Sequence, residues 1–352
     1  MELAVNIGID DALDLARAAE ELGYRTVLAS DNFRSDALTV LSYVAAHTER
    51  IGLLPGVLQL PARSPAATAT AAAALHVLSK GRFAIGLGVS NPDVSEGWHG
   101  VGFDHPVSRL REYTTILRSA LAGEQVRFQG RHHRLPYGER DKAPLQLAMA
   151  PGAGGVPLYI GASSPRSLRL TGAVADGWIG AFTSVSDVAD AVAEIRSGRT
   201  AAGADGAFDV LPSMATYIDD GVENAADALR PHYARLLGVG DVETNFYCRL
   251  LRQGGYADRA EEIHDRLHHG DHDGAAAAVP LEFVDDTALI GPGRRVARRM
   301  DDYAAAGATC LGIMITAARA TTQEKIRQLG EAMRARALMR SDRGADSIRT
   351  YG

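Results

Sequence analysis

The stretch that decides the fold covers residues 51–112 and reads IGLLPGVLQLPARSPAATATAAAALHVLSKGRFAIGLGVSNPDVSEGWHGVGFDHPVSRLRE. Two apolar runs, residues 51–60 and 82–89, bracket an alanine-rich segment, residues 65–78. Apolar runs bounded by Gly or Pro are typical of strands buried on both faces. The segment between them predicts a helix that begins after Ser64 and stops near Lys80-Gly81. Together they form a βαβ unit, the building block of a parallel sheet.

The same unit recurs along the chain. Strands are expected at residues 3–7, 26–29, 51–60, 82–89, 156–162, 177–182, 210–218 and 308–316. Helices are expected at residues 12–22, 37–49, 65–78, 106–122, 165–175, 186–197 and 322–336. Eight strands with alternating helices predict an α/β fold, a (β/α)8 TIM barrel. A doubly wound open sheet would fit six of these strands about as well, so the pattern favours the barrel without excluding the sheet.

The remaining segments do not follow this alternation of strands and helices. Residues 129–155 carry several Pro and Gly and predict a long loop. Residues 225–280 are helical in pattern and predict a helical insertion between the seventh and eighth strands. We expect residues 1–340 to form a single domain, and we expect the polar residues 341–352 to form a poorly ordered tail.

Composition narrows the class of protein. Apolar residues make up 46% of the chain and charged residues 23%, as is usual for a soluble protein. The net charge of -6 does not favour binding to nucleic acid. Cys248 and Cys310 do not have the spacing of a disulfide framework or of a thiolate metal site. The acidic start does not resemble a signal peptide, and no run of 18 apolar residues predicts a membrane span. We therefore expect a cytoplasmic protein.

In such a barrel the site lies where the strands end. The loop at residues 90–100 is too polar for a core, as expected of a site-bearing loop. The strand ends carry no Ser-His-Asp or Cys-His set and are rich in small residues, which let the backbone approach a flat ligand. This favours a large planar cofactor over metal-assisted hydrolysis. The candidate binding residues at the strand ends are Asp31, Gly56, Val57, Gly88, Ser90, Gly161, Ala162, Ser163, Ser164, Gly180 and Ala181.

Several segments then point to a family. TVLASDN, the 51–88 stretch, VSEGWHG, PLYIGASSPRSLRLTGAVADGWIG and ALIGPGRRVARRMDDYAAAGATCLGIMI follow one another between residues 26 and 315. In this order they resemble the bacterial luciferase-like flavin superfamily, and within it the branch that depends on coenzyme F420, near the methylenetetrahydromethanopterin reductase-like proteins. The resemblance implies a luciferase-like (β/α)8 barrel.

The resemblance also assigns parts of a cofactor site. It implies a non-proline cis peptide between Gly56 and Val57, behind the central ring of the deazaflavin. The GASSPRS turn, residues 161–167, resembles the loop that holds the cofactor phosphate, where backbone N–H groups and the helix end would bind an anion. Arg166 would add charge there, or it is a solvated first-turn residue. Gly180 and Ala181 would line the other side of the phosphate, whereas we expect Trp178 to pack in the core.

Three residues, Asn32, Glu96 and His99, are candidates for a catalytic role. Asp31 matches the acidic residue of the family's second-strand motif, but Asn32 stands where many members have His, and an amide cannot carry a proton at neutral pH. Glu96 matches the family's glutamate after the fourth strand. It would donate a proton if burial raised its pKa, or it is a surface carboxylate. His99 would line the substrate side, or it is a structural hydrogen-bonding group.

The sequence therefore predicts an F420-dependent oxidoreductase of the luciferase-like family that transfers a hydride between the deazaflavin C5 and a small-molecule or peptide-like organic substrate. Reduction of an activated C=C or C=N bond suits Asn32 best. The alternatives are an FMN-dependent monooxygenase and a non-catalytic flavin- or F420-binding protein. A homodimer is expected by analogy. Four histidines, His264, His268, His269 and His272, have spacings that can bind zinc, but the matching region of the family is a solvated helix and no metal is expected.

Overall fold

The computed structural model describes residues 1–138, 142–151 and 155–346. Contacts between residues divide the chain into two compact units. The N-terminal unit comprises Asn6–Gly180 with Asp190–Leu211, and the C-terminal unit comprises Met1–Val5, Ala181–Ala189 and the chain from Pro212 onward. The expectation of one domain over residues 1–340 stays a prediction.

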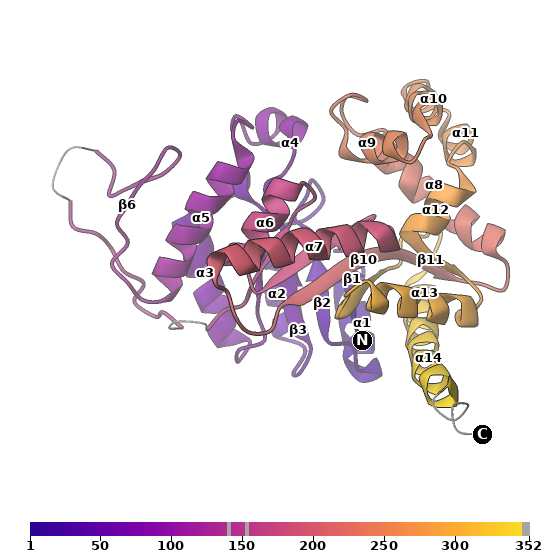
Figure 1. Ribbon diagram of the computed structural model, residues 1–352, viewed down its shortest axis with the longest axis horizontal. Helices are drawn as coiled ribbons and strands as arrows, with labels where there is room; N and C mark the ends of the chain where they lie inside the picture. Colours follow the sequence, from indigo (N-terminus) through magenta and orange to yellow (C-terminus); the bar gives the residue numbers. More distant parts are fainter. Residues whose placement is uncertain (139–141, 152–154, 347–352) are drawn as a thin grey trace. The chain divides into compact units, whose positions relative to one another are not determined.

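The N-terminal unit is a series of βα repeats whose strands pair in parallel, apart from the antiparallel pair β6–β7 (Figure 1). Parallel ladders join β2 to β3, β4 to β5, β5 to β8 and β8 to β9. The strands of this unit are β2 (Thr26–Ala29), β3 (Gly52–Pro55), β4 (Leu58–Gln59), β5 (Ile85–Gly88), β6 (Phe128–Gln129), β7 (Arg134–Leu135), β8 (Leu158–Gly161) and β9 (Gly177–Ala181). Its helices are α1 (Ala12–Leu22), α2 (Ala37–Ala45), the 3-10 turn η1 (Leu60–Ala62), α3 (Pro65–Leu78), α4 (Pro92–Gly97), α5 (Pro106–Leu121) and α6 (Pro165–Val174).

The C-terminal unit combines parallel strands with a group of short helices. β12 pairs with β1 and with β10, and β10 also pairs with β11. α8 contacts α9, α10, α11 and α12, so these helices form one layer (Figure 1). The remaining elements of the chain are β1 (Glu2–Ile7), α7 (Val185–Ala202), β10 (Asp209–Ile218), α8 (Val222–Leu237), α9 (Phe246–Gln253), α10 (Ala257–His268), α11 (His272–Ala277), α12 (Leu281–Thr287), β11 (Ala288–Gly291), α13 (Gly293–Ala305), β12 (Cys310–Met314) and α14 (Thr322–Asp346).

The strand order is that of a parallel barrel. Hydrogen-bonded neighbours follow the order β3-β2-β1-β12-β10-β9-β8-β5-β4, with β11 beside β10. β3 and β4 are the two halves of the predicted third strand, so the order returns to the strand from which it began. All eight predicted strands are present, and the predicted (β/α)8 fold is confirmed. One further strand of this sheet, β11, was not predicted, since ALIG at 288–291 is only four residues long.

Helices begin and end where the sequence places caps. The Ser64 side chain accepts a hydrogen bond from the Ala67 N–H, with Pro65 at the first helical position, so α3 has its predicted bounds. α1 also has its predicted bounds and ends at Gly23, whose φ of 82° is left-handed. These two ends were predictable because one residue determines each of them.

Three predicted segments differ from the structure. The loop expected at residues 90–100 contains α4, because the Asn91 side chain accepts the Val94 N–H at 2.9 Å and Pro92 favours a first helical turn. The loop expected at residues 129–155 opens with the antiparallel β6–β7 hairpin, and residues 139–141 and 152–154 lie outside the described residues. α14 continues to Asp346 instead of stopping at residue 336, since good helix formers follow that position; residues 347–352 lie outside the described part.

Two half-buried charged side chains, Arg82 and Glu20, hold the start of the third strand. The Arg82 guanidinium donates to the carbonyls of Ala45, Thr48, Ile51 and Ser79 at 2.9–3.0 Å, and so caps the C-terminal ends of α2 and α3. A carboxylate oxygen of Glu20 accepts three backbone N–H groups from residues 49–51. β3 is thereby fixed at its entry, opposite the end that carries the candidate site. No helix among the described residues has both the length and the apolar character needed to span a bilayer.

Candidate functional site

The third strand is interrupted where the site was expected. The peptide bond between Gly56 and Val57 is cis, as predicted. Val57 is half-buried, and its side chain lies between the ends of two neighbouring strands. A Cβ atom added to Gly88 would lie 2.4 Å from Val57 Cγ2, and one added to Gly161 would lie 3.3 Å from Val57 Cγ1. The ends of β4, β5 and β8 therefore meet around one valine side chain.

Other small residues at the strand ends are required by the packing of the chain itself. A Cβ on Gly86 would lie 1.9 Å from the carbonyl oxygen of Pro55, and one on Gly180 would lie 2.4 Å from the ring of Trp178. Gly88, Gly161 and Gly180 were predicted to let a flat ligand approach the backbone. At Gly86, Gly88 and Gly180 the space for such an approach is filled by protein, whereas Gly161 leaves more room.

A chain of polar contacts crosses the same strand ends. Ser90 Oγ donates to Gln59 Oε1 at 2.9 Å, and Gln59 Nε2 donates to the carbonyl oxygen of Asp31 at 2.7 Å. The Gln59 N–H also approaches Asp31 Oδ2 at 3.4 Å. Partial burial raises the pKa of Asp31 above its usual value. Asp31 and Ser90, both predicted site residues, are thus joined through Gln59, which follows the cis peptide.

The side chain of Asn32 stabilises the turn after β2. Asn32 Oδ1 accepts the Arg34 N–H at 2.8 Å, and the Asn32 N–H donates to the Ser35 carbonyl at 3.1 Å. This leaves Phe33 58% exposed, and its ring lies edge-on to Trp98, which is 67% exposed, with centroids 5.4 Å apart. Asn32 is exposed beside this aromatic pair.

Glu96 and His99 lie in and after α4. Glu96 is exposed and Glu96 Oε1 accepts the Phe103 N–H at 2.9 Å, so the burial expected of a proton donor is absent. His99 is half-buried, and its backbone N–H donates to the Val94 carbonyl at 3.1 Å.

The GASSPRS turn forms the start of α6 with a capping box. Ser164 Oγ accepts the Ser167 N–H, and Ser167 Oγ accepts the Ser164 N–H at 3.1 Å. Pro165 has no N–H, so two of the donors that an anion was expected to use are not available. The exposed hydroxyl groups of Ser163 and Ser164, together with the exposed Arg166, remain at this helix start.

The strand beside this turn supports it. Trp178 is buried, as expected for a core residue, and Trp178 Nε1 donates to the Ala162 carbonyl at 2.8 Å. Gly180 is buried and Ala181, the last residue of β9, is exposed. The carbonyl of Ala162 is therefore oriented by the indole, and the turn that follows it has a fixed start.

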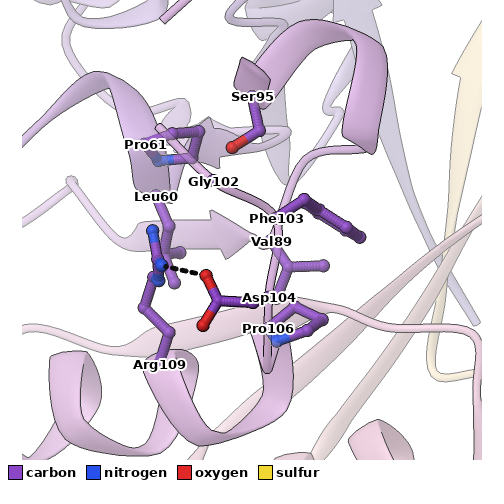
Figure 2. A pocket seen from close by; sticks show the side chains of 9 residues that line it. All are labelled: Leu60, Pro61, Val89, Ser95, Gly102, Phe103, Asp104, Pro106 and Arg109. Atoms are coloured by element: carbon purple, nitrogen blue, oxygen red, sulfur yellow. Dashed lines mark hydrogen bonds and ion pairs between the residues drawn. The ribbon is translucent and has the colours of Figure 1, made fainter. Parts of the chain in front are cut away.

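A small cavity lies beside the end of β5 (Figure 2). Its volume is about 10 Å³, room for about one water molecule, and an ion pair between Arg109 and Asp104 at 3.4 Å forms part of its wall. Val89 and Ser95 line it, but none of the predicted site residues does. It is too small for an organic cofactor.

Comparison with known proteins places this arrangement in a family. The pattern of the luciferase-like monooxygenase family matches residues 2–310. The chain belongs to the luciferase-like monooxygenase family. A relative from Mycobacterium tuberculosis, Rv3520c, named as a coenzyme F420-dependent oxidoreductase, is 34% identical over 325 residues, which is 90% of this chain and 92% of the relative.

Two further proteins are similar to this luciferase-like chain. The 5,10-methylenetetrahydromethanopterin reductase of Archaeoglobus fulgidus is 26% identical over 295 residues, 83% of this chain and 86% of the relative. The solved structure of the coenzyme F420-dependent tetrahydromethanopterin reductase of Methanopyrus kandleri superposes with a TM-score of 0.78 at 22% identity, covering 94% of this chain and 97% of that one. The last comparison supports the luciferase-like barrel fold.

Sequence reasoning missed two features of this luciferase-like site. Gln59 was not among the predicted site residues, although it joins Asp31 to Ser90. Phe33 was not singled out, and its contact with Trp98 joins segments 65 positions apart. The alternation of a strand predicts which residues share a face, but it does not predict which side chains meet across strand ends.

Proposed function

We propose that this chain is a coenzyme F420-dependent oxidoreductase acting on an organic substrate. The observation that carries the proposal is the 34% identity to an F420-dependent relative over nine tenths of the chain. The strand ends support it, because they bring Asp31, Gln59 and Ser90 together as polar groups that a ligand could contact.

The residues present fit such a cofactor. The strand ends around Val57 would receive the flat ring system, and Asp31, Gln59 and Ser90 would offer polar contacts at its edge. The hydroxyl groups of Ser163 and Ser164, with Arg166, would meet the phosphate. When bound, the cofactor supplies hydride exchange at C5 of its deazaflavin.

The chain's own residues would position the substrate and deliver a proton. The exposed rings of Phe33 and Trp98 offer an apolar surface beside Asn32. Asn32 would act only through hydrogen bonds, which suits reduction of an activated C=C or C=N bond better than oxidation of an alcohol. The proton would come from Glu96, which is in contact with solvent, or from water. Holding both reactants in near-attack geometry would be the main contribution of the protein.

Turnover tests this function. Purified protein is mixed with reduced F420 and a panel of enones, imines and dehydroamino acids, and the return of the oxidised cofactor absorbance is followed. We expect oxidation with at least one acceptor, and we expect Glu96→Gln to lower the rate without changing cofactor affinity if Glu96 is the donor. The matched control is Glu49→Gln, an exposed carboxylate of the same unit. No oxidation above that of a protein-free control, with any acceptor, would contradict the proposal.

The second candidate is an FMN-dependent monooxygenase. The observation that favours it is the match to the luciferase-like monooxygenase family over residues 2–310. Oxygen consumption with reduced FMN, measured on the same protein preparation, separates the two functions. Consumption that depends on an organic substrate would establish the monooxygenase.

A further inference from the structure

A second region of the N-terminal unit is built around a buried carboxylate. The β6–β7 hairpin turns tightly, with the Gly130 N–H donating to the His133 carbonyl at 2.9 Å. Glu112, 9% exposed, accepts the backbone N–H groups of Arg131, His132 and His133 at 2.8, 2.9 and 3.0 Å. A Cβ on Gly130 would lie 2.5 Å from the Glu112 carboxylate, so only glycine fits there. The hairpin tip is therefore fixed in one conformation by α5.

Beside this hairpin tip lies a cavity of about 480 Å³, within the range of small-molecule sites. One wall is the first turn of α3 and the other is the hairpin. The lining residues are Ser64, Pro65, Ala66, Arg131, His132, His133, Arg134, Leu135 and Tyr137. Two arginines and two histidines are among them, and there is no carboxylate.

The positive charge of this cavity is not neutralised by the described residues. Neither the Arg131 nor the Arg134 side chain forms an ion pair with a carboxylate in the described part of the chain. Glu112 is already engaged by three backbone donors and by His133, whose Nδ1 lies 3.4 Å from Glu112 Oε2. The start of α3 adds the partial positive charge of a helix N-terminus.

Two ring nitrogens in the wall are buried without a hydrogen-bond partner among the described residues. They are His132 Nε2 and His133 Nδ1, and the latter has only its 3.4 Å contact with Glu112 Oε2. Buried polar atoms in proteins are nearly always paired with protein, water or ligand. Burial lowers the pKa of His132, so this imidazole is neutral near pH 7 and can either donate or accept. The wall thus offers two exposed guanidinium charges, with two half-buried imidazole side chains beside them.

We propose that this cavity binds a small organic anion, a carboxylate or a phosphate ester, between the hairpin tip and the first turn of α3. Arg131 and Arg134 would hold the anionic group by charge-assisted hydrogen bonds. Pro65, Leu135 and Tyr137 would contact the apolar part of the ligand. The site shares no residue with the proposed cofactor site, and the proposal does not depend on the use of F420.

Calorimetric titration of the full chain at low salt tests this site. The probes are phenyl phosphate, benzoate and inorganic phosphate. Wild type is compared with Arg131→Gln, Arg134→Gln and the double variant. Because both side chains are exposed and the fold of the hairpin uses their backbone groups, the variants should keep the wild-type melting temperature. The matched control is Arg127→Gln, an exposed arginine near the same hairpin that does not line the cavity.

We expect saturable binding of at least one organic probe, weakened about tenfold or more by each single variant and unchanged by Arg127→Gln. Tighter binding of phenyl phosphate than of benzoate assigns a phosphate ester, and the reverse order assigns a carboxylate. No saturable binding of any probe at about 10 mM would overturn the proposal. An equal loss in Arg127→Gln would also overturn it, because the binding would then be a general effect of surface charge.

Discussion

At the end of β5, Gly88 faces the side chain of Val57 so closely that no methyl group fits between them. Its Cβ would lie 2.4 Å from Val57 Cγ2 and 3.5 Å from Val57 Cβ. The other methyl group of Val57 faces Gly161, where an added Cβ would lie 3.3 Å from Val57 Cγ1. One glycine thus determines where the end of β4 lies relative to β5.

We therefore predict that Gly88→Ala lowers the free energy of unfolding by about 1–3 kcal/mol, as overpacking typically does. Urea unfolding, followed by circular dichroism, measures this loss. The control is Gly97→Ala, because a Cβ at Gly97 has no atom within 4 Å. Equal stability of Gly88→Ala and wild type would show that Val57 can move aside.

At the same scale, the sequence predicted some of the residues that meet at the strand ends and did not predict others. Asp31 and Ser90 could be placed because each lies within two residues of the end of an apolar strand. The role of Gln59 depends on the register that sets it opposite Gly88, and periodicity does not give register. The exposure of Glu96 could not be predicted either, because it depends on α4, a six-residue helix inside a polar stretch.

At the scale of elements, the β6–β7 hairpin depends on a single charged side chain from α5. Burial alone would raise the pKa of Glu112, but the three N–H donors and nearby His132 hold that pKa below its usual value. A carboxyl group whose pKa is lowered by folding stabilises the folded state above its unfolded pKa, about 4.3. That stabilisation is lost as the pH falls through the lower, folded pKa.

We predict that Glu112→Gln destabilises the protein by about 1–3 kcal/mol at pH 7, since an amide oxygen cannot serve three donors as a carboxylate does. The difference from wild type should shrink as the pH falls below about 4. Unfolding free energies measured from pH 7 to pH 3 give this profile. Glu49→Gln, at an exposed carboxylate, should show no such trend. A Glu112→Gln effect that stays constant over this range would mean that the charge of Glu112 contributes nothing.

Element boundaries were predictable where one residue determines them. Ser64 and Pro65 begin α3, and Gly23 ends α1 in a left-handed conformation. The short strand β11 and the short helix α4 were missed, because periodicity needs more residues than either element contains. The hairpin was also missed, since its register depends on the contact with Glu112 and not on the pattern of its own side chains.

At the scale of the whole molecule, the strand order follows from the repetition of βα units. Strands buried on both faces read as apolar runs, and parallel crossovers leave few orders possible. The family membership agrees with this order, because the luciferase-like pattern spans residues 2–310. The anion cavity lies outside what either the repetition or the family pattern predicts, since it is formed by a hairpin tip and a helix start that are more than 60 residues apart.

The central claim is that the strand ends around Val57 hold a deazaflavin. It is tested most directly by titrating the protein with oxidised F420 and, in parallel, with FMN, while the fluorescence of each cofactor is followed. We expect saturable F420 binding with a Kd of about 10 µM or lower and binding of FMN at least tenfold weaker. Tighter binding of FMN than of F420, or an F420 titration that does not saturate, would contradict it.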